Sequence, residues 1–136
     1  MNGDRRKRGR LRRGATAALV TGMLMTSACD GHEEIVRTAR QLTGGDPSRA
    51  PRAIRKYGCG SCHNIPGIAG ARGLVGPPLD RFGLRTYVAG RLTNDAAHLT
   101  SWIEHPRNVD PKTAMPDMGV TPQDARDIAA YLYTLR

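Results

Sequence analysis

The chain has 136 residues, enough for one small domain and too few for two. Aromatic side chains make up only 4% of it, with one Trp and one Phe, so the protein alone offers little apolar area for a core. A formal charge of +9 suggests nucleic-acid binding at first sight. However, residues 5–13 hold seven positive charges, and from Asp30 onward 14 Lys and Arg stand against 11 Asp and Glu. The excess charge therefore belongs to the amino terminus and does not indicate a nucleic-acid-binding domain.

An uncharged apolar stretch, residues 14–28, follows the basic run directly. It has about the length of the apolar region of an export signal and is too short for a comfortable membrane span. We therefore expect residues 1–28 to be an export signal that uses general secretion. The stretch ends in Ser27-Ala28-Cys29, which resembles the box at which bacterial lipoproteins are cleaved and acylated.

We predict lipidation of Cys29, because a free exposed thiol in an oxidising compartment would be a liability. Cleavage after Ala28 without a lipid, and an uncleaved anchor, are the alternatives. Residues 29–47 are polar and contain Gly44-Gly45, so we expect a tether, with at most a short helix over residues 33–41. The protein would then lie on the periplasmic side of the inner membrane, lipid-anchored, with soluble periplasmic or otherwise anchored forms as alternatives.

The chemistry of the chain is concentrated in a C-x-x-C-H motif, Cys59-Gly60-Ser61-Cys62-His63. Residues three and four apart share one face of a helical turn, so both thiols and the imidazole can face the same group. This spacing is typical of covalent haem attachment, in which the thiols add to two vinyl groups and the imidazole coordinates iron. We predict one haem c, bound by Cys59, Cys62 and His63.

Three other interpretations of the motif remain open at this point. A structural zinc site needs four ligands, and Cys29 is the only other cysteine. A thioredoxin-like redox pair requires a preceding strand and a βαβ pattern, neither of which the sequence indicates. A chance occurrence of the motif is the third.

The residues around the motif predict helices separated by irregular loops. Ser48 is expected to cap a helix with Pro51 in its first turn. Residues 64–79 are interrupted by glycines and prolines yet are too apolar for a disordered linker, so we expect a loop that covers one face of the haem. The apolar stripe of the first helix consists of Ala53, Ile54 and Tyr57, and we assign Tyr57 to core packing.

Three further helices are predicted in the second half of the chain. Residues 80–91 are expected to form a short helix broken at Gly83, and Asn94 or Asp95 to cap a helix over residues 96–105. Thr121 and Pro122 open the last helix. Its apolar face comprises Ala125, Ile128, Ala129, Leu132 and Leu135; that of the preceding helix comprises Leu99, Trp102 and Ile103. Several helices without alternating strands predict an all-α fold.

Taken together, these features over residues 48–136 resemble the class I c-type cytochromes. The resemblance rests on the C-x-x-C-H motif after an amphipathic helix, on Gly76-Pro77-Pro78-Leu79, on the loop Pro111–Met115 and on the closing helix. More narrowly, residues 90–116 are similar to the haem domain fused to subunit II of bacterial cytochrome c oxidases. The resemblance implies a cytochrome c domain over residues 48–136, with three to five helices packed around one covalently bound haem.

By this resemblance His63 is the proximal iron ligand and Met115 the distal one. Pro77 would offer its backbone carbonyl to the other ring nitrogen of His63 and so fix the imidazole. A thioether prefers soft ferrous iron, which supports a methionine ligand independently. Met118 is an alternative distal ligand, and ligation by a second histidine, His98 or His105, is another.

With both axial positions filled, the iron has no vacancy for substrate, so we expect a one-electron carrier in a respiratory chain and not an enzyme. Its partners would be membrane redox proteins such as a terminal oxidase or a quinol–cytochrome c reductase, and not nucleic acid. A basic docking patch for an acidic partner could comprise Arg72, Arg81, Arg85 and Arg91. A haem-based gas sensor or peroxidase-like enzyme with an open iron site is one alternative, and a haem relay subunit of a larger oxidase or dehydrogenase is another.

Overall fold

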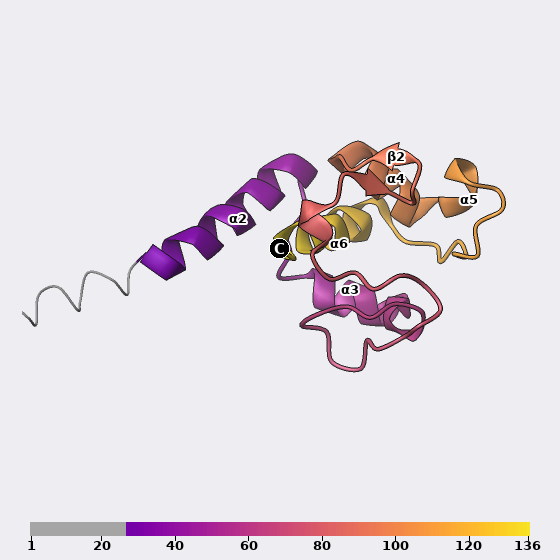
Figure 1. The fold of residues 1–136 in the computed structure, drawn as a ribbon, viewed down its shortest axis with the longest axis horizontal. Coiled ribbons are helices and arrows are strands. Elements are labelled where there is room, and N and C mark those ends of the chain that lie inside the picture. Colours follow the sequence, from indigo (N-terminus) through magenta and orange to yellow (C-terminus); the bar gives the residue numbers. More distant parts are fainter. Residues whose placement is uncertain (1–26) are drawn as a thin grey trace, which may run out of the picture. The chain divides into compact units, whose positions relative to one another are not determined.

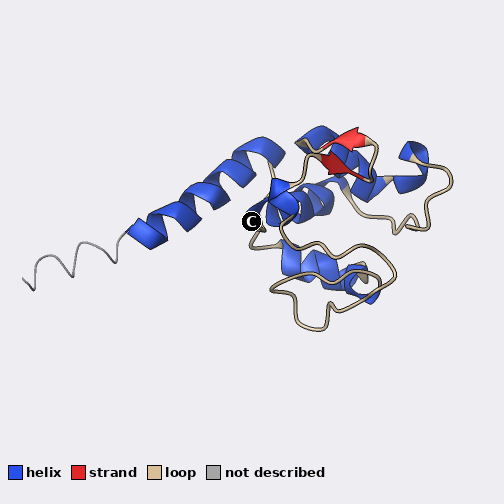
Figure 2. Cartoon of the chain, viewed as in Figure 1, coloured by secondary structure: helices blue, strands red, loops and turns tan. Residues whose placement is uncertain are grey.

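The computed structural model describes the backbone of residues 27–136 and the side chains of residues 31–136. The predicted export signal lies outside this part except for its last two residues, and so does the side chain of Cys29. The described helices are α2 (Ser27–Thr43), α3 (Ala50–Lys56), α4 (Ala96–Glu104), α5 (Pro106–Val109) and α6 (Pro122–Thr134) (Figure 1). The described part also contains two 3₁₀ turns, η1 (Cys59–Ser61) and η2 (Phe82–Leu84). One hairpin is formed by β1 (Tyr87–Val88) and β2 (Leu92–Thr93). The mostly helical content confirms the predicted all-α class (Figure 2).

The chain divides into two compact units, residues 1–33 and 34–136. Every buried residue of the described part belongs to the second unit. No helix in the described part of the chain has the length and apolar character needed to cross a bilayer.

Helix α6 is the central element of the second unit and packs against α3, α4 and η2. It begins as predicted: the hydroxyl of Thr121 accepts a hydrogen bond from the Asp124 backbone N at 3.2 Å, and Pro122 occupies the first turn. Three alanines on the helix are fully buried, Ala125, Ala129 and Ala130. Because these side chains are small, neighbouring helices can approach the α6 backbone closely.

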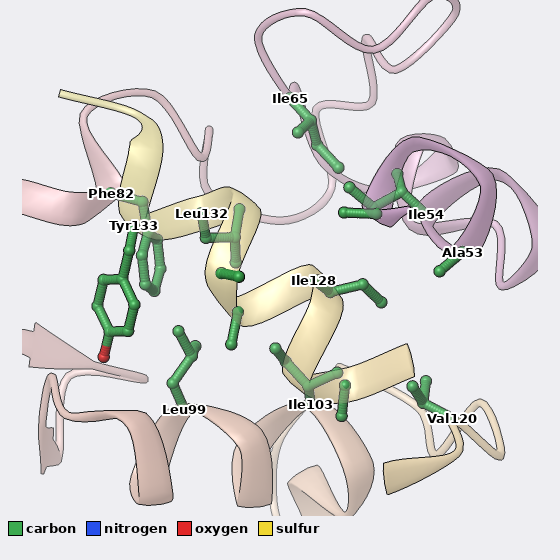
Figure 3. Packing of buried hydrophobic residues seen from close by; sticks show 14 of the residues in the cluster. Ala53, Ile54, Ile65, Phe82, Leu99, Ile103, Val120, Ile128, Leu132 and Tyr133 are labelled. Carbon is green, nitrogen blue, oxygen red and sulfur yellow. The ribbon is translucent and has the colours of Figure 1, made fainter. Parts of the chain in front are cut away.

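Helices α3 and α4 approach α6 from different sides (Figure 3). Leu99 and Ile103 of α4 are buried as predicted, at 1% and 7% exposure. Asp95, and not Asn94, caps α4 by accepting a hydrogen bond from the His98 backbone N at 2.9 Å. Fully burying a side chain of this size stabilises the fold by roughly 1.5–3 kcal/mol, so these contacts supply much of the core.

The predicted stripe of α3 is also buried, but the predicted cap is wrong. Arg49 is the residue that precedes α3, and it makes no side-chain cap. The Ser48 hydroxyl instead donates to Asp46 Oδ1 at 2.8 Å, because Ser48 takes part in the turn that leads into the helix.

The prediction of a helix over residues 80–91 is wrong as well. The chain there forms η2 and then a two-stranded antiparallel hairpin in which Tyr87 pairs with Thr93. Ala89 and Gly90 have φ values of 54° and 66°, a left-handed conformation that ends any helix and makes the hairpin turn. The amide of Asn94 donates to the carbonyls of Phe82 and Arg85 at 3.2 and 2.9 Å, so Asn94 closes this loop and does not cap α4.

The segment predicted as a tether is helical over Ser27–Thr43, longer than the short helix expected. Within the second unit, Ala39 and Thr43 are buried at 2% and 6% exposure. A Cβ at Gly45 would collide with the backbone of Arg126, so this residue lies directly against α6. Residues 39–47 therefore pack onto the domain that was expected to begin at Ser48.

A buried carboxylate on α6, that of Asp127, holds the segment before α3 against the domain. Asp127, 2% exposed, accepts hydrogen bonds from the Asp46 backbone N at 2.7 Å and from Gln123 Nε2 at 2.9 Å. It also accepts from Arg49 Nε and Nη2, at 2.8 and 2.9 Å. Burial alone would raise the pKa of Asp127, but these hydrogen bonds outweigh it and hold the pKa below its ordinary value.

We predict that Asp127→Asn lowers the free energy of unfolding of the haem-loaded protein by about 2 kcal/mol near neutral pH, because an amide group would face the Arg49 donors. The Arg49 side chain is 58% exposed, so most of the loss comes from the buried acceptor and little from the ion pair. The pKa of Asp127 is lower in the folded protein than in the unfolded chain. The stabilisation by Asp127 is therefore fully present above its pKa in the unfolded chain, and it is lost as pH falls through its pKa in the folded protein.

Denaturant unfolding at several pH values measures both the loss of stability in Asp127→Asn and its dependence on pH. The difference between wild type and Asp127→Asn should shrink as pH falls from about 5 to about 2. Asp80→Asn, at an exposed aspartate, is the control and should stay within about 0.5 kcal/mol of wild type. A difference independent of pH would contradict the assignment of the stabilisation to the ionised carboxylate.

Candidate haem site

The C-x-x-C-H motif lies on a tight turn immediately after α3. Gly58 has φ +69°, a left-handed conformation that turns the chain from α3 into η1. The backbone N–H groups of Cys62 and His63 both donate to the carbonyl of Cys59, at 3.3 and 3.0 Å. These bonds hold the two thiols and the imidazole on a single turn, which we call the attachment turn (residues 58–63).

Both thiols of the attachment turn are free and partly buried. Burial raises the pKa of the Cys59 thiol above its ordinary value, and the neighbouring Cys62 adds to the effect. Burial therefore favours the neutral thiol of Cys59 over the thiolate.

The imidazole of His63 is oriented by a backbone carbonyl. Its Nδ1 lies 2.8 Å from the carbonyl O of Pro77. Because a carbonyl oxygen can only accept, Nδ1 carries the proton and Nε2 keeps its lone pair. A hydrogen bond from the second ring nitrogen is what typically fixes and strengthens a metal-ligating histidine. The two residues that the sequence paired are thus in contact, and His63 is left with one nitrogen able to bind a metal.

Backbone hydrogen bonds hold the glycine-rich loop (residues 64–79) against the attachment turn. Gly73 N donates to Gly60 O at 3.1 Å, and Gly76 N donates to Cys62 O at 2.8 Å. Farther along, Leu79 N donates to Asn64 O at 2.8 Å. These bonds therefore fix the second half of the loop, residues 73–79, through its backbone.

Three glycines make this close approach feasible. A Cβ at Gly60 would lie 2.7 Å from the Cβ of Ala71, and one at Gly73 would collide with the backbone of Ser61 and Cys62. A Cβ at Gly76 would lie 2.6 Å from Nδ1 and 2.8 Å from Nε2 of His63. The sequence predicted an irregular loop from these glycines but gave no means of knowing which of them touch the motif.

The predicted distal ligand lies in the loop from Asp110 to Thr121, which we call the methionine loop. Met115 is half-buried, whereas Met118 is 44% exposed. The loop is braced locally: Met115 N donates to the hydroxyl of Thr113 at 3.1 Å, and Gly119 N donates to Asp117 Oδ1 at 3.1 Å. Of the two methionines, Met115 is thus the one less exposed to solvent.

The two alternative histidine ligands have acidic neighbours. His98 Nδ1 lies 2.7 Å from Asp95 Oδ2, and His105 Nδ1 lies 3.4 Å from Asp117 Oδ2. Among the described residues no group of three or more His, Cys, Asp or Glu could hold a metal ion, so the zinc alternative, which needs four ligands, finds no support there.

Two of the four arginines of the predicted docking patch have partners within the chain. The guanidinium of Arg85 donates to the carbonyls of Pro78 and Asp80 and lies 5.1 Å from the ring centroid of Phe82. Arg91 Nε lies 3.4 Å from Asp110 Oδ2. Arg85 thus braces the end of the glycine-rich loop.

Comparison with known families shows which family the chain belongs to. Residues 48–136 match the family model for cytochrome c. The chain belongs to the cytochrome c family. The predicted resemblance is thereby confirmed, and membership of the cytochrome c family means covalently bound haem c with its iron, also as predicted. The family serves haem-based electron transfer, generally without enzymatic activity.

One curated relative of this cytochrome c is cytochrome c oxidase subunit 2 from Alkalihalophilus pseudofirmus, 32% identical over 86 residues. The match covers 62% of the present chain but only 24% of that relative, so the cytochrome c spans about a quarter of the subunit's length. No solved structure matches the chain.

The residues of this cytochrome c fit the cofactor. The glycine-rich loop lies so close that Gly73 and Gly76 leave no room for a Cβ between the loop and the attachment turn. His63 is already held in the tautomer that a metal ligand requires. Two free thiols stand on the same turn.

Sequence reasoning missed one group near the site. Tyr57 is buried as assigned, at 7% exposure, but its hydroxyl also joins Lys56, Thr121 and Asp124 in a hydrogen-bonded network. Nothing in the sequence pairs residues 57 and 124, because their contact depends on how α3 packs against α6.

We predict that Gly76→Ala strongly reduces the yield of haem-loaded cytochrome c, because the added Cβ would displace the His63 ring. The exported protein would be measured by haem staining and by its absorption spectrum, relative to total protein. Gly31→Ala is the control, since a Cβ there meets nothing within 4 Å. Normal haem content in Gly76→Ala would contradict the close packing of the loop on the imidazole.

Proposed function

We propose that this cytochrome c transfers single electrons between membrane redox proteins of a respiratory chain. In this proposal Cys59 and Cys62 would carry the haem as thioethers, and His63 and Met115 would be the two residues that ligate its iron. The observation that carries it is the 2.8 Å contact between His63 Nδ1 and the Pro77 carbonyl O, which leaves Nε2 as a ready ligand. When bound, the haem supplies a one-electron ferric/ferrous couple.

The choice of Met115 as the distal ligand is supported by its surroundings. It is half-buried in a braced loop, while Met118 is 44% exposed and the two candidate histidines have acidic neighbours. A thioether ligand stabilises ferrous iron and raises the reduction potential, as suits a carrier that feeds electrons toward an oxidase.

Hydrogen bonds to the backbone restrain the residues that would hold the haem, which suits electron transfer. The backbone bonds from the glycine-rich loop to the attachment turn restrain Cys62, and the Pro77 carbonyl restrains His63. A carrier needs little rearrangement between its two oxidation states, and a ligand fixed by rigid backbone meets that need.

We predict that Met115→Ala abolishes the ferric methionine–iron absorption band, opens the iron to carbon monoxide in the reduced state and lowers the reduction potential, because the thioether is lost. Met118→Ala is the matched control and should keep the band and exclude carbon monoxide. The reverse pattern would assign the ligand to Met118. A wild-type protein that binds carbon monoxide at rest would instead indicate the gas sensor or peroxidase-like alternative and overturn the electron-carrier proposal.

The proposed location is the periplasmic side of the inner membrane, with the protein held by a lipid on Cys29. The support comes from the basic and apolar residues 5–28 and the small residues before Cys29. Residues 29–47 would connect the lipid to the cytochrome c domain, the last of them packed on that domain through Asp127.

We predict that mass spectrometry of the mature protein from membranes finds an amino-terminal Cys29 carrying an acyl-glyceryl group, together with one covalent haem. Cys29→Ser should lose the acyl mass and appear in the soluble periplasmic fraction. A mature chain that begins at residue 29 without a lipid would contradict the lipid anchor and leave the haem assignment standing.

The proposed partners are a terminal oxidase and a quinol–cytochrome c reductase. Similarity to a protein named as an oxidase subunit favours an oxidase as electron acceptor, and also favours a second candidate function, a haem relay subunit within an oxidase complex. Purification in mild detergent distinguishes the two, because a relay subunit would co-purify with the oxidase in fixed ratio.

A further inference from the structure

Tyr57 occupies the junction between α3 and the attachment turn, two residues before Cys59. Its ring is buried, and its hydroxyl donates a short hydrogen bond, 2.6 Å, to Asp124 Oδ2. The same hydroxyl accepts from Lys56 Nζ at 2.9 Å and from Thr121 N at 3.3 Å. All the hydrogen-bonding capacity of the phenol oxygen is therefore used.

Two of the three partners of this hydroxyl, Thr121 and Asp124, lie where the methionine loop ends. Thr121 is the last residue of that loop and the N-cap of α6, and Asp124 stands in the first turn of the helix. Val120, next to Thr121, is buried at 8% exposure, so the loop enters the core at this point. One phenol oxygen, on the residue directly before the attachment turn, thus bonds to the end of the segment that carries Met115.

The hydrogen bond from Tyr57 is charge-assisted, because Asp124 remains ionised. The hydrogen bond from the Tyr57 hydroxyl holds the pKa of Asp124 below its ordinary value, and the hydrogen bond from Lys56 is the second cause. Hydrogen bonds to an ionised carboxylate are shorter and roughly twice as strong as neutral ones. Core packing alone would be served equally well by phenylalanine, which fills the same space without the oxygen.

We propose that Tyr57 is a positioning residue whose hydroxyl holds the end of the methionine loop against the attachment turn, and thereby keeps Met115 on the haem iron. The inference rests on the proposed ligation by His63 and Met115. Tyr57 acts on Met115 through its hydrogen bonds to Thr121 and Asp124.

The test replaces Tyr57 by phenylalanine in the full-length, haem-loaded protein. Tyr133→Phe is a matched control: Tyr133 is 8% exposed, lies on α6 and donates to Asn94 Oδ1 at 3.3 Å, away from the methionine loop. Asp124→Asn is a second variant that keeps the backbone cap but removes the charge. The readout is the rate at which added imidazole displaces the methionine from ferric iron, followed by the loss of the methionine–iron band.

Imidazole displacement should be about tenfold faster in Tyr57→Phe, equivalent to about 1.4 kcal/mol. Asp124→Asn should change the rate in the same direction, and Tyr133→Phe should stay within about twofold of wild type. A wild-type displacement rate in both Tyr57→Phe and Asp124→Asn would overturn the inference, even if both variants unfold more easily. A wild-type protein without a methionine–iron band would overturn the proposed ligation, and the positioning role with it.

Discussion

The candidate haem site depends on one contact between a side chain and the backbone, the hydrogen bond from His63 to the Pro77 carbonyl. It decides which ring nitrogen stays free, and its geometry depends on where the glycine-rich loop lies. That loop is in turn fixed by backbone bonds to Gly60 and Cys62. The motif and the loop are therefore joined both by backbone bonds and by the His63 imidazole.

Helix α6 provides the frame in which this unit sits. Its small buried residues admit α3 and α4, and its carboxylates reach segments far away in sequence. Asp124 binds the end of α3 through Tyr57, and Asp127 binds the chain before α3 through Asp46 and Arg49. Two acids one turn apart thus anchor both ends of the helix that leads into the haem motif.

Much of this could be predicted from the sequence, and the failures have physical reasons. The helix around Leu99 and the closing helix were predicted because their periodicity and N-caps are local signals. The hairpin at Ala89 was missed because a non-glycine residue with positive φ leaves no mark in the sequence. The haem motif could be predicted from the spacing of its residues. The contacts of Tyr57 with Thr121 and Asp124, and of Asp127 with Asp46 and Arg49, could not, since these partners lie 64 or more residues away.

The glycine-rich loop has a consequence for how the surface of the protein can change. The loop is bonded to the motif through the backbone N–H groups of Gly73 and Gly76. The side chains of Leu74 and Val75, which lie between these two residues, are 90% and 79% exposed. Because these hydrogen bonds join main-chain atoms, replacing the side chains of Leu74 and Val75 removes none of their donors or acceptors. Substitutions at these two positions therefore keep all the backbone groups that join the loop to the attachment turn.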